Sequence, residues 1–268
     1  MIKILKRLVN NIGIDIIKHN SNITNPTLLQ EKYQTLIKES IYLFEKYNGY
    51  KLPENPQRVV LLSKLLGTNI SEGLSIVSCL NKSLSVSGDI CEFGVAQGTT
   101  SALMSNEIKG LKERNLWLFD SFEGLPMPTE KDQLKDDIFS LGSMEAYKGT
   151  MACGIDQVSS RLKEISFPKE NTMVVSGFIE QTIHLKNLPE KVCFAYVDFD
   201  FYEPILIALN FLHSRMEKGS FVVVDDYDWF STGAKTAVDE FFEQNQSFYK
   251  LTVPDKTLGH FAILEKIA

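Results

Sequence analysis

The chain has 268 residues, of which 44% are hydrophobic, 10% aromatic and 23% charged. These proportions exclude a wholly disordered or fibrous protein, and the length suits one large α/β domain with an extension. Lys and Arg total 28 against 34 Asp and Glu, which gives a formal net charge of −6. Nucleic-acid binders present clustered basic residues to the phosphates, so this mildly acidic chain without a Lys/Arg cluster is predicted to bind no nucleic acid.

The cysteines indicate a reducing compartment. Cys79, Cys91, Cys153 and Cys193 are widely spaced and form no CxxC pair. Because such spacing argues against a disulfide framework or a zinc site, we expect a cytoplasmic protein. No apolar run approaches the roughly 20 residues that span a bilayer. The segment Met1–Asn20 also lacks the uninterrupted apolar core of a signal peptide.

The first part of the chain, residues 1–84, is predicted to be an N-terminal helical extension or cap. Residues 2–18 carry apolar side chains at helical spacing with basic residues between them. This helix either docks on the main domain or a second subunit, or makes a reversible contact with a membrane surface. A polar linker follows at 19–27, and a helical pattern runs from Leu28 to about Leu84. A homo-oligomer is possible, because this part carries more apolar surface than a cap needs.

The second part, residues 85–268, alternates short apolar runs with helical segments. We expect strands at Ile90–Phe93, Leu116–Phe119, Met173–Val175, Val192–Val197 and Phe221–Val224, and helices at Thr99–Lys109, Ile179–Lys186, Ile205–Arg215 and Ala234–Glu243. This alternation predicts a parallel sheet covered by helices on both faces. Two closing strands, Phe248–Val253 and Phe261–Leu264, have no helix between them. Such an ending favours a methyltransferase-type sheet over that of a dinucleotide dehydrogenase.

A glycine turn and an acidic strand end indicate an adenosine-type ligand. Gly94 and Gly98 follow the first strand, where the absence of Cβ atoms allows a sharp turn and a close approach of a ligand. Their spacing does not match the GxGxxG fingerprint of dinucleotide sites. Asp120 ends the second strand and is suited to accept hydrogen bonds from ribose hydroxyls. A plain tight turn and a solvated Asp are the alternatives.

Acidic residues also end two later strands of the predicted sheet. Asp198 follows one buried strand, and Asp225 and Asp226 follow the next. If these strands are parallel neighbours, the three carboxylates converge, and a divalent cation relieves their repulsion. Ligation by oxygen alone suits Mg²⁺ or Mn²⁺. Helix capping is the alternative; it suits Asp200 or Asp228, but it explains two successive acidic strand ends poorly.

A set of motifs extends from about residue 85 to the C-terminus. They are Glu92–Val95, Trp117–Pro126 (WLFDSFEGLP), Ser176–Phe178, Val197–Glu203 (VDFDFYE), Val224–Tyr227 and Gly233–Val238. In this order the set resembles the macrocin O-methyltransferase (TylF-type) family. The resemblance implies a Rossmann-like, seven-stranded class I methyltransferase sheet. It also implies S-adenosyl-L-methionine as methyl donor, Mg²⁺ as cofactor, and a hydroxyl, typically of a sugar, as acceptor.

The same resemblance implies roles for individual residues. Asp198, Asp225 and Asp226 would hold the metal, and Asp198 would double as the general base. The donor-binding residues would be Glu92, Gly94, Val95, Asp120, Ser121, Ser176, Gly177 and Phe178. Asp120 would hold the ribose, and Ser176 to Phe178 would line the adenine end. Pro204-Ile205 and Gly219-Ser220 depart from the family pattern, which leaves the subfamily and the substrate open.

The sequence thus predicts an O-methyltransferase that acts on a small-molecule or glycan-linked sugar with Mg²⁺-assisted deprotonation. Two alternatives stay open: a metal-dependent methyltransferase of a catechol-like small molecule, and a catalytically inactive Rossmann-like binding module. An NAD-dependent oxidoreductase is disfavoured because GxGxxG and Tyr-x-x-x-Lys are missing. Residues 126–160 combine glycines with mixed polarity, as a lid would. Tyr227 and Trp229, just past the acidic pair, face the acceptor sugar or pack under that lid.

Overall fold

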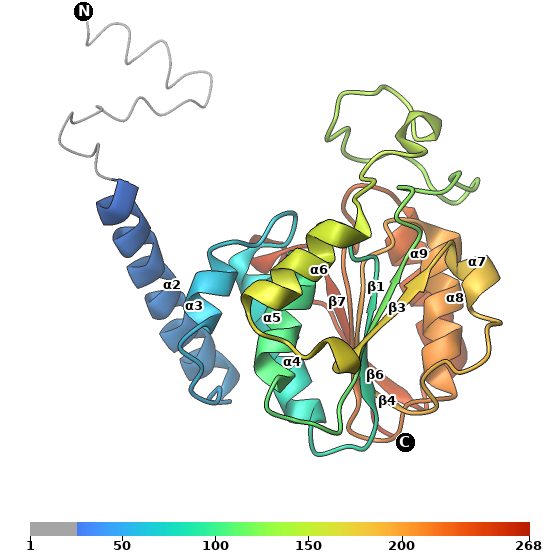
Figure 1. The fold of residues 1–268 in the computed structure, drawn as a ribbon. Helices are drawn as coiled ribbons and strands as arrows, with labels where there is room; N and C mark the ends of the chain where they lie inside the picture. Colours follow the sequence, from blue (N-terminus) through green and yellow to red (C-terminus); the bar gives the residue numbers. More distant parts are fainter. Residues whose placement is uncertain (1–25) are drawn as a thin grey trace, which may run out of the picture.

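The computed structural model describes residues 26–268, and the predicted helix over residues 2–18, with its membrane or subunit contact, lies outside them. Seven strands form one sheet in the order β3-β2-β1-β4-β5-β7-β6 (Figure 1). The strands are β1 (Asp89–Phe93), β2 (Leu116–Asp120), β3 (Thr172–Ser176), β4 (Val192–Val197), β5 (Phe221–Val224), β6 (Tyr249–Thr252) and β7 (Ala262–Lys266). Strands β1 to β5 run parallel, and β7 lies antiparallel between β5 and β6. The predicted class I methyltransferase sheet is confirmed.

Helices cover both faces of this sheet, so the molecule has three layers (Figure 1). One face carries α4 (Ile70–Ser83), α5 (Thr99–Ile108) and α6 (Ile155–Glu164), and the other carries α7 (Ile179–Thr182), α8 (Tyr202–His213) and α9 (Gly233–Asn245). Short 3-10 turns lie at η2 (Glu145–Tyr147), η3 (Lys169–Asn171) and η4 (Lys256–Leu258). Because both faces are covered, the central strands read as continuous apolar runs.

Strand β4 shows how the sequence sets this layering. All of its residues are buried, and successive side chains point to opposite faces of the sheet. Tyr196 therefore belongs to the core on the α4 face, and Val197 belongs to the core on the α8 face. The strand ends between these two cores, so the next residue, Asp198, lies at the carboxyl edge of the sheet.

The N-terminal part contains α2 (Pro26–Asn48), α3 (Arg58–Leu62) and α4. Helix α2 contacts the core through Ile37, Ile41 and Phe44, and it extends away from the body at its N-terminal end (Figure 1). Helix α4 packs directly on β4 and β5. A domain boundary after residue 84 would therefore place α4, a helix that covers the sheet, in the N-terminal cap. The division into two domains stays a prediction.

Two expected elements differ from the structure. Helix α7 ends at Thr182, although a helix to Lys186 was predicted, and Asn187 then adopts a left-handed conformation with φ of 67°. The expected lid over 126–160 also includes the start of α6, whose Val158 and Leu162 are buried in the core. The irregular segment is therefore 126–154.

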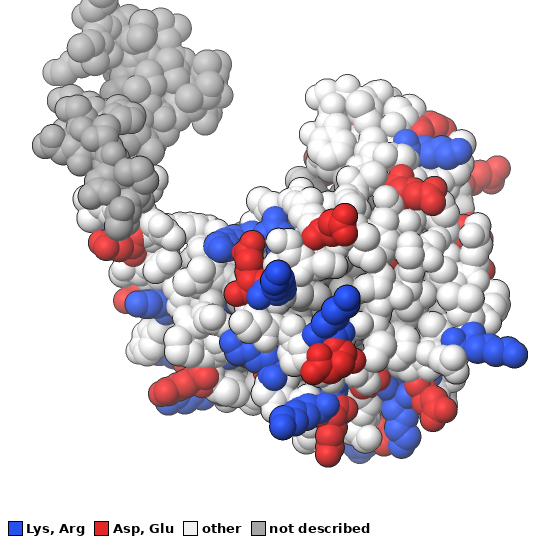
Figure 2. All heavy atoms as spheres, viewed as in Figure 1, with Lys and Arg blue, Asp and Glu red and all other residues white. Residues whose placement is uncertain are grey.

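The surface carries mixed charge. On the face viewed in Figure 2, Lys and Arg side chains lie interspersed with Asp and Glu. Within residues 26–268, every helix is either too short or too polar to cross a membrane.

Candidate functional site

A cavity of about 710 Å³ lies at the carboxyl edge of the sheet. This volume falls within the range of small-molecule sites, and the place is where open α/β sheets bind their ligands. The cavity is lined by nine residues that the sequence analysis selected: Gly94, Val95, Asp120, Ser121, Gly177, Phe178, Asp198, Asp225 and Asp226. Two other selected residues, Glu92 and Ser176, do not line it.

Gly94 is required by a close approach of two strand ends. Its φ is +85°, and a Cβ atom there would lie 1.8 Å from the carbonyl oxygen of Asp198. The N–H of Asp198 also donates to the carbonyl oxygen of Phe93 at 2.7 Å. A side chain at position 94 would therefore separate the end of β1 from the end of β4, and this glycine keeps the turn beside Asp198.

Asp120 fixes the glycine turn in place. Its Oδ2 accepts hydrogen bonds from the N–H groups of Val95 at 2.7 Å and Ala96 at 3.0 Å, and its Oδ1 accepts one from Phe122 at 2.6 Å. Ala96 and Phe122 have positive φ angles of 43° and 57°. The carboxylate thus supports two strained turns while it lines the cavity.

Glu92 lies beneath the turn and is inaccessible to solvent. Its two carboxylate oxygens accept hydrogen bonds from the hydroxyls of Thr100 and Ser101 at the start of α5. Burial raises the pKa of Glu92 to about 8, although these hydrogen bonds oppose the shift. This residue ties α5 to β1, and its place in the structure is one of support below the cavity floor.

Three carboxylates converge on one side of the cavity. Oxygens of Asp198, Asp200 and Asp226 all lie within 4.8 Å of one another. Asp200 and Asp226 adopt left-handed conformations, with φ of 61° and 55°, which are uncommon for non-glycine residues. The structure therefore brings Asp200 into the group in which the sequence analysis placed Asp225.

The electrostatics of this group differ from those of the nearby Asp228. Burial first, and then repulsion from neighbouring carboxylates, raises the pKa of Asp198, Asp200 and Asp226 well above the usual range. Asp228 instead forms ion pairs with Lys135 and Lys256, which lower its pKa to about 2. Within residues 26–268, no lysine or arginine forms an ion pair with any member of the converging group.

Asp225 lines the cavity but has partners of its own. Its Oδ2 accepts a hydrogen bond from the hydroxyl of Tyr196 at 2.7 Å, and its Oδ1 accepts one from the N–H of Asp226 at 2.7 Å. Glu72 of α4 is 2% exposed, and its Oε1 lies 3.4 Å from the same hydroxyl. Burial and then the charge of Asp225 raise the pKa of Glu72 well above the usual range.

The segment 126–154 forms part of the cavity wall through Ile138, Phe139 and Met151. Its residues Met144 and Tyr147 pack with Leu125, Phe201 and Phe230 in a small core of their own. This small core anchors the segment to the loops that follow β4 and β5.

Aromatic and N-terminal residues complete the wall of the cavity. Trp229 lines the cavity and lies 4.7 Å from the ring of His260, centroid to centroid. Tyr227 does not line it; this residue is buried and donates to Asp239 at 2.7 Å. Leu66 and Thr68, from the turn between α3 and α4, also line the cavity, so the N-terminal part contributes to the site.

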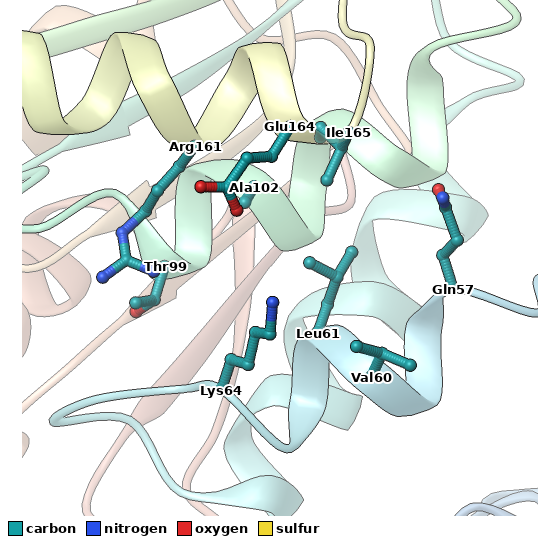
Figure 3. A pocket seen from close by; sticks show the side chains of 9 residues that line it. All are labelled: Gln57, Val60, Leu61, Lys64, Thr99, Ala102, Arg161, Glu164 and Ile165. Atoms are coloured by element: carbon teal, nitrogen blue, oxygen red, sulfur yellow. The ribbon is translucent and has the colours of Figure 1, made fainter.

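A second, smaller cavity of about 230 Å³ lies between α3, α5 and α6. Figure 3 shows the side chains of Lys64 and Arg161 extending toward this space, together with the carboxylate of Glu164. It shares Thr99 with the large cavity, and it contains none of the converging carboxylates. The large cavity is therefore the candidate active site.

Residues 75–261 match the family described as Macrocin-O-methyltransferase (TylF). The chain belongs to this family. The expected family is thus confirmed, and the expected class, O-methyltransferase, is the one that the description of this family names.

Two characterised O-methyltransferases are similar to part of this chain. It is 29% identical over 145 residues to the 8-demethyl-8-(2,3-dimethoxy-alpha-L-rhamnosyl)-tetracenomycin-C 4'-O-methyltransferase of Streptomyces olivaceus, covering 53% of this chain and 54% of that relative. It is 26% identical over 207 residues to the demethyldecarbamoylnovobiocin O-methyltransferase of Streptomyces niveus, covering 76% and 75%. The chain therefore spans about half the length of the first of these relatives.

A solved structure supports the fold. The O-methyltransferase NovP matches 89% of this chain and 100% of its own, with a TM-score of 0.64 and 20% sequence identity. At this identity the likeness shows the shared fold.

Sequence reasoning missed three residues of this TylF-family site. Asp200 was assigned to a helix cap, although its position two residues after Asp198 was a usable signal. Tyr196 resembles any apolar strand residue in the sequence. Glu72 lies in an amphipathic helix far from the motifs, so only the packing of α4 on the sheet reveals it.

Proposed function

We propose that this chain transfers the methyl group of S-adenosyl-L-methionine to a hydroxyl of a sugar-containing small molecule, with Mg²⁺ assisting the deprotonation. The observation that carries the proposal is the direct contact between the glycine turn and the carboxylate group. A Cβ on Gly94 would collide with the backbone of Asp198, so a donor seated at the turn would lie beside the acidic residues.

The donor half of the cavity fits the adenosine and methionine parts of this cofactor. This half is lined by Gly94, Val95, Asp120, Gly177 and Phe178. The oxygens of Asp120 already accept three backbone N–H groups, so a ribose hydroxyl would use the remaining lone pair on Oδ1. We assign Glu92 a supporting role under the turn. Ser176 lies exposed at the end of β3, and its proposed contact with the donor stays a prediction.

The carboxylate half fits a hard divalent cation. Asp198, Asp200 and Asp226 supply oxygen ligands only, which Mg²⁺ prefers. Their charges lack a basic partner within the described residues, and repulsion between like charges favours a cation among them. We propose these three as the ligands, with Asp225 either joining them from the cavity side or supporting Asp226.

The chain's own residues then perform the transfer. The cavity aligns the acceptor oxygen with the methyl carbon and the sulfur, and such positioning supplies roughly 7–11 kcal/mol of the barrier. As the O–C bond forms, the C–S bond breaks and its electron pair stays on sulfur. A carboxylate oxygen of Asp198 accepts the hydroxyl proton, a contribution of about 10²–10⁴-fold. A bound cation would lower the pKa of that hydroxyl.

The acceptor is proposed from the remaining lining residues of the cavity. Trp229 offers an aromatic face, and Leu66 and Thr68 come from the N-terminal part. The relative from Streptomyces olivaceus is named for a rhamnosyl substrate, which supports a sugar as the acceptor. A catechol-like phenol would meet the same carboxylates, so the acceptor assay must include one.

The test uses the full chain with labelled S-adenosyl-L-methionine and a panel of sugar nucleotides, glycosylated small molecules and a catechol, with Mg²⁺ or with EDTA. We expect transfer to a sugar that EDTA abolishes and that Asp198→Asn reduces by about 10²–10⁴-fold. The exposed Asp156→Asn is the matched control. Transfer that persists in EDTA would overturn the metal assignment. Absence of stabilisation by millimolar S-adenosylhomocysteine would instead favour an inactive binding module.

A further inference from the structure

The hydroxyl of Tyr196 lies behind the proposed metal site, on the α4 face of the sheet. The side chain is inaccessible to solvent. Its oxygen lies 2.7 Å from Asp225 Oδ2 and 3.5 Å from Asp198 Oδ2. Thr68 and Glu72, both from the N-terminal part, lie at 3.4 Å. One phenol thus contacts four oxygen-bearing side chains, two of which line the carboxylate half of the cavity.

A phenol has a single proton to donate, so these contacts are unequal. The distance to Asp225 is typical of an O–H···O bond, whereas the three others are at the long limit. The proton of Tyr196 therefore belongs to Asp225.

Asp225 in turn restrains the backbone of Asp226. With Oδ2 held by Tyr196, its Oδ1 accepts the backbone N–H of Asp226 at 2.7 Å. Asp226 has a φ of 55°, a conformation that costs an ordinary residue of order 1–3 kcal/mol and persists only where its surroundings impose it. The bond between Asp225 and the Asp226 N–H is such a surrounding contact.

We propose that Tyr196 is a positioning residue of the metal site: through Asp225, its hydroxyl holds the backbone of Asp226 so that the Asp226 carboxylate lies beside those of Asp198 and Asp200. This inference rests on the proposed function for the identity of the bound ion. On this proposal, Tyr196, a buried and uncharged residue of β4, determines the geometry of the carboxylates that bind the metal. Partners of this kind commonly change metal affinity by 10–100-fold when they are removed.

The chain offers a matched control for a purely structural role. Tyr249 of β6 is also buried, and its hydroxyl has no hydrogen-bond partner. Tyr249→Phe and Tyr196→Phe each delete one oxygen from a buried strand tyrosine. A role limited to core packing would make the two variants alike in metal binding.

The experiment titrates Mn²⁺ alone into the full chain and follows the free ion by electron paramagnetic resonance. We expect Tyr196→Phe to weaken Mn²⁺ binding by about 10–100-fold, and Tyr249→Phe to leave it unchanged. The affinity for S-adenosylhomocysteine, measured by calorimetry without metal, should stay the same in both variants, since neither tyrosine lines the cavity.

A double-mutant cycle tests the route through Asp225. Asp225→Asn retains one carbonyl oxygen, which can serve Tyr196 or the Asp226 N–H, so it should also weaken Mn²⁺ binding. The double variant with Tyr196→Phe should then be no weaker than the worse single variant. Fully additive losses would overturn the route, and Asp225→Asn also provides the test if Tyr196→Phe fails to fold.

The outcomes separate this inference from the function on which it rests. If the unaltered chain binds Mn²⁺ and Tyr196→Phe binds it equally well, the positioning role is wrong and the metal site stands. If the unaltered chain binds no Mn²⁺, the metal site and the positioning role both fall. Methyl transfer that is independent of added metal would then agree with that second result.

Discussion

The carboxylate of Asp120 and the backbone N–H of Val95 form a 2.7 Å hydrogen bond that joins the end of β2 to the glycine turn after β1. The same oxygen accepts the N–H of Ala96, which has a positive φ. We expect Asp120→Asn to weaken S-adenosylhomocysteine binding by about tenfold or more, because an amide group cannot accept these bonds with both of its heteroatoms. Calorimetric titration measures the affinity.

The control for this variant is Glu113→Gln, an exposed acidic residue between α5 and β2. It removes one negative charge without touching the turn, so its affinity should equal that of the unaltered chain. Equal affinities for Asp120→Asn and the unaltered chain would show that the turn keeps its shape without Asp120.

Glu92 predicts a pH dependence of stability. Its pKa rises on folding from about 4.5 to about 8, so the folded state binds this proton more tightly than the unfolded state. Its contribution to stability is therefore fully present below pH 4.5 and is lost as the pH rises toward 8. Glu92→Gln removes this titration, and its free energy of unfolding should fall less over that interval than that of the unaltered chain.

Urea denaturation of both proteins at several pH values between 5 and 8 measures this difference. The other buried carboxyls titrate in both proteins, so the difference between the two curves isolates Glu92. Parallel curves would mean that Glu92 keeps an ordinary pKa in the fold.

The sequence predicted the fold well because each central strand is marked by an apolar run. Val192–Val197 was assigned with the bounds that β4 has, since burial on both faces leaves no polar interruption. Helix α7 was overextended because Leu185 and Lys186 continue a helical pattern, while a left-handed Asn187 ends the segment. Such backbone reversals outside glycine carry little sequence signal.

The site was predicted only where residues line the strand ends. Asp198 follows β4 directly and Asp226 lies two residues after the end of β5, so the parallel order of these strands brings both to the same edge of the sheet. Asp200 enters the group through its left-handed backbone, and Asp225 turns to Tyr196. Those orientations depend on local turns and on a cross-layer contact, neither of which a single sequence encodes as a pattern.

The raised pKa values of Asp198, Asp200 and Asp226 predict that metal affinity rises with pH. Burial and mutual repulsion favour protonated carboxyls in the absence of a cation, and a cation must displace those protons to bind. We expect Mn²⁺ affinity to increase from pH 6 to pH 8.5 with release of protons. Calorimetry in buffers of different ionisation enthalpy counts them, and a pH-independent affinity would contradict the expectation.

We expect the carboxylate of Asp132 to hold the segment 126–154 against the body of the protein. Its buried carboxylate accepts hydrogen bonds from Thr129 and from the N–H of Tyr202 at 2.7 Å, and a Cβ on Gly233 would lie 1.8 Å from it. Asp132→Ala leaves the Tyr202 N–H without its partner, at a cost of about 1–3 kcal/mol. Limited proteolysis should then cleave within 126–154 faster than in the unaltered chain.

Asp136→Ala, four residues along the same segment, is the control for Asp132→Ala. If both variants are cleaved at the rate of the unaltered chain, Asp132 does not secure the segment. S-adenosylhomocysteine should slow cleavage in the unaltered chain if the segment acts as the predicted lid.

Helix α2 predicts self-association. Its exposed apolar side chains follow a heptad pattern in which Ser40 occupies one position, with Leu36 at 63% and Tyr47 at 82% exposure: Leu29, Tyr33, Leu36, Leu43 and Tyr47. This heptad seam lies beside the one that Ile37 and Phe44 bury against the core, and seams of this spacing pack helix against helix. A second copy related by a two-fold axis would cover it with the same surface.

We expect Leu36→Glu with Leu43→Glu to convert a dimer to a monomer in sedimentation velocity, while Lys38→Glu, on the opposite side of α2, should leave the dimer intact. A chain that sediments as a monomer before any substitution would refute the dimer.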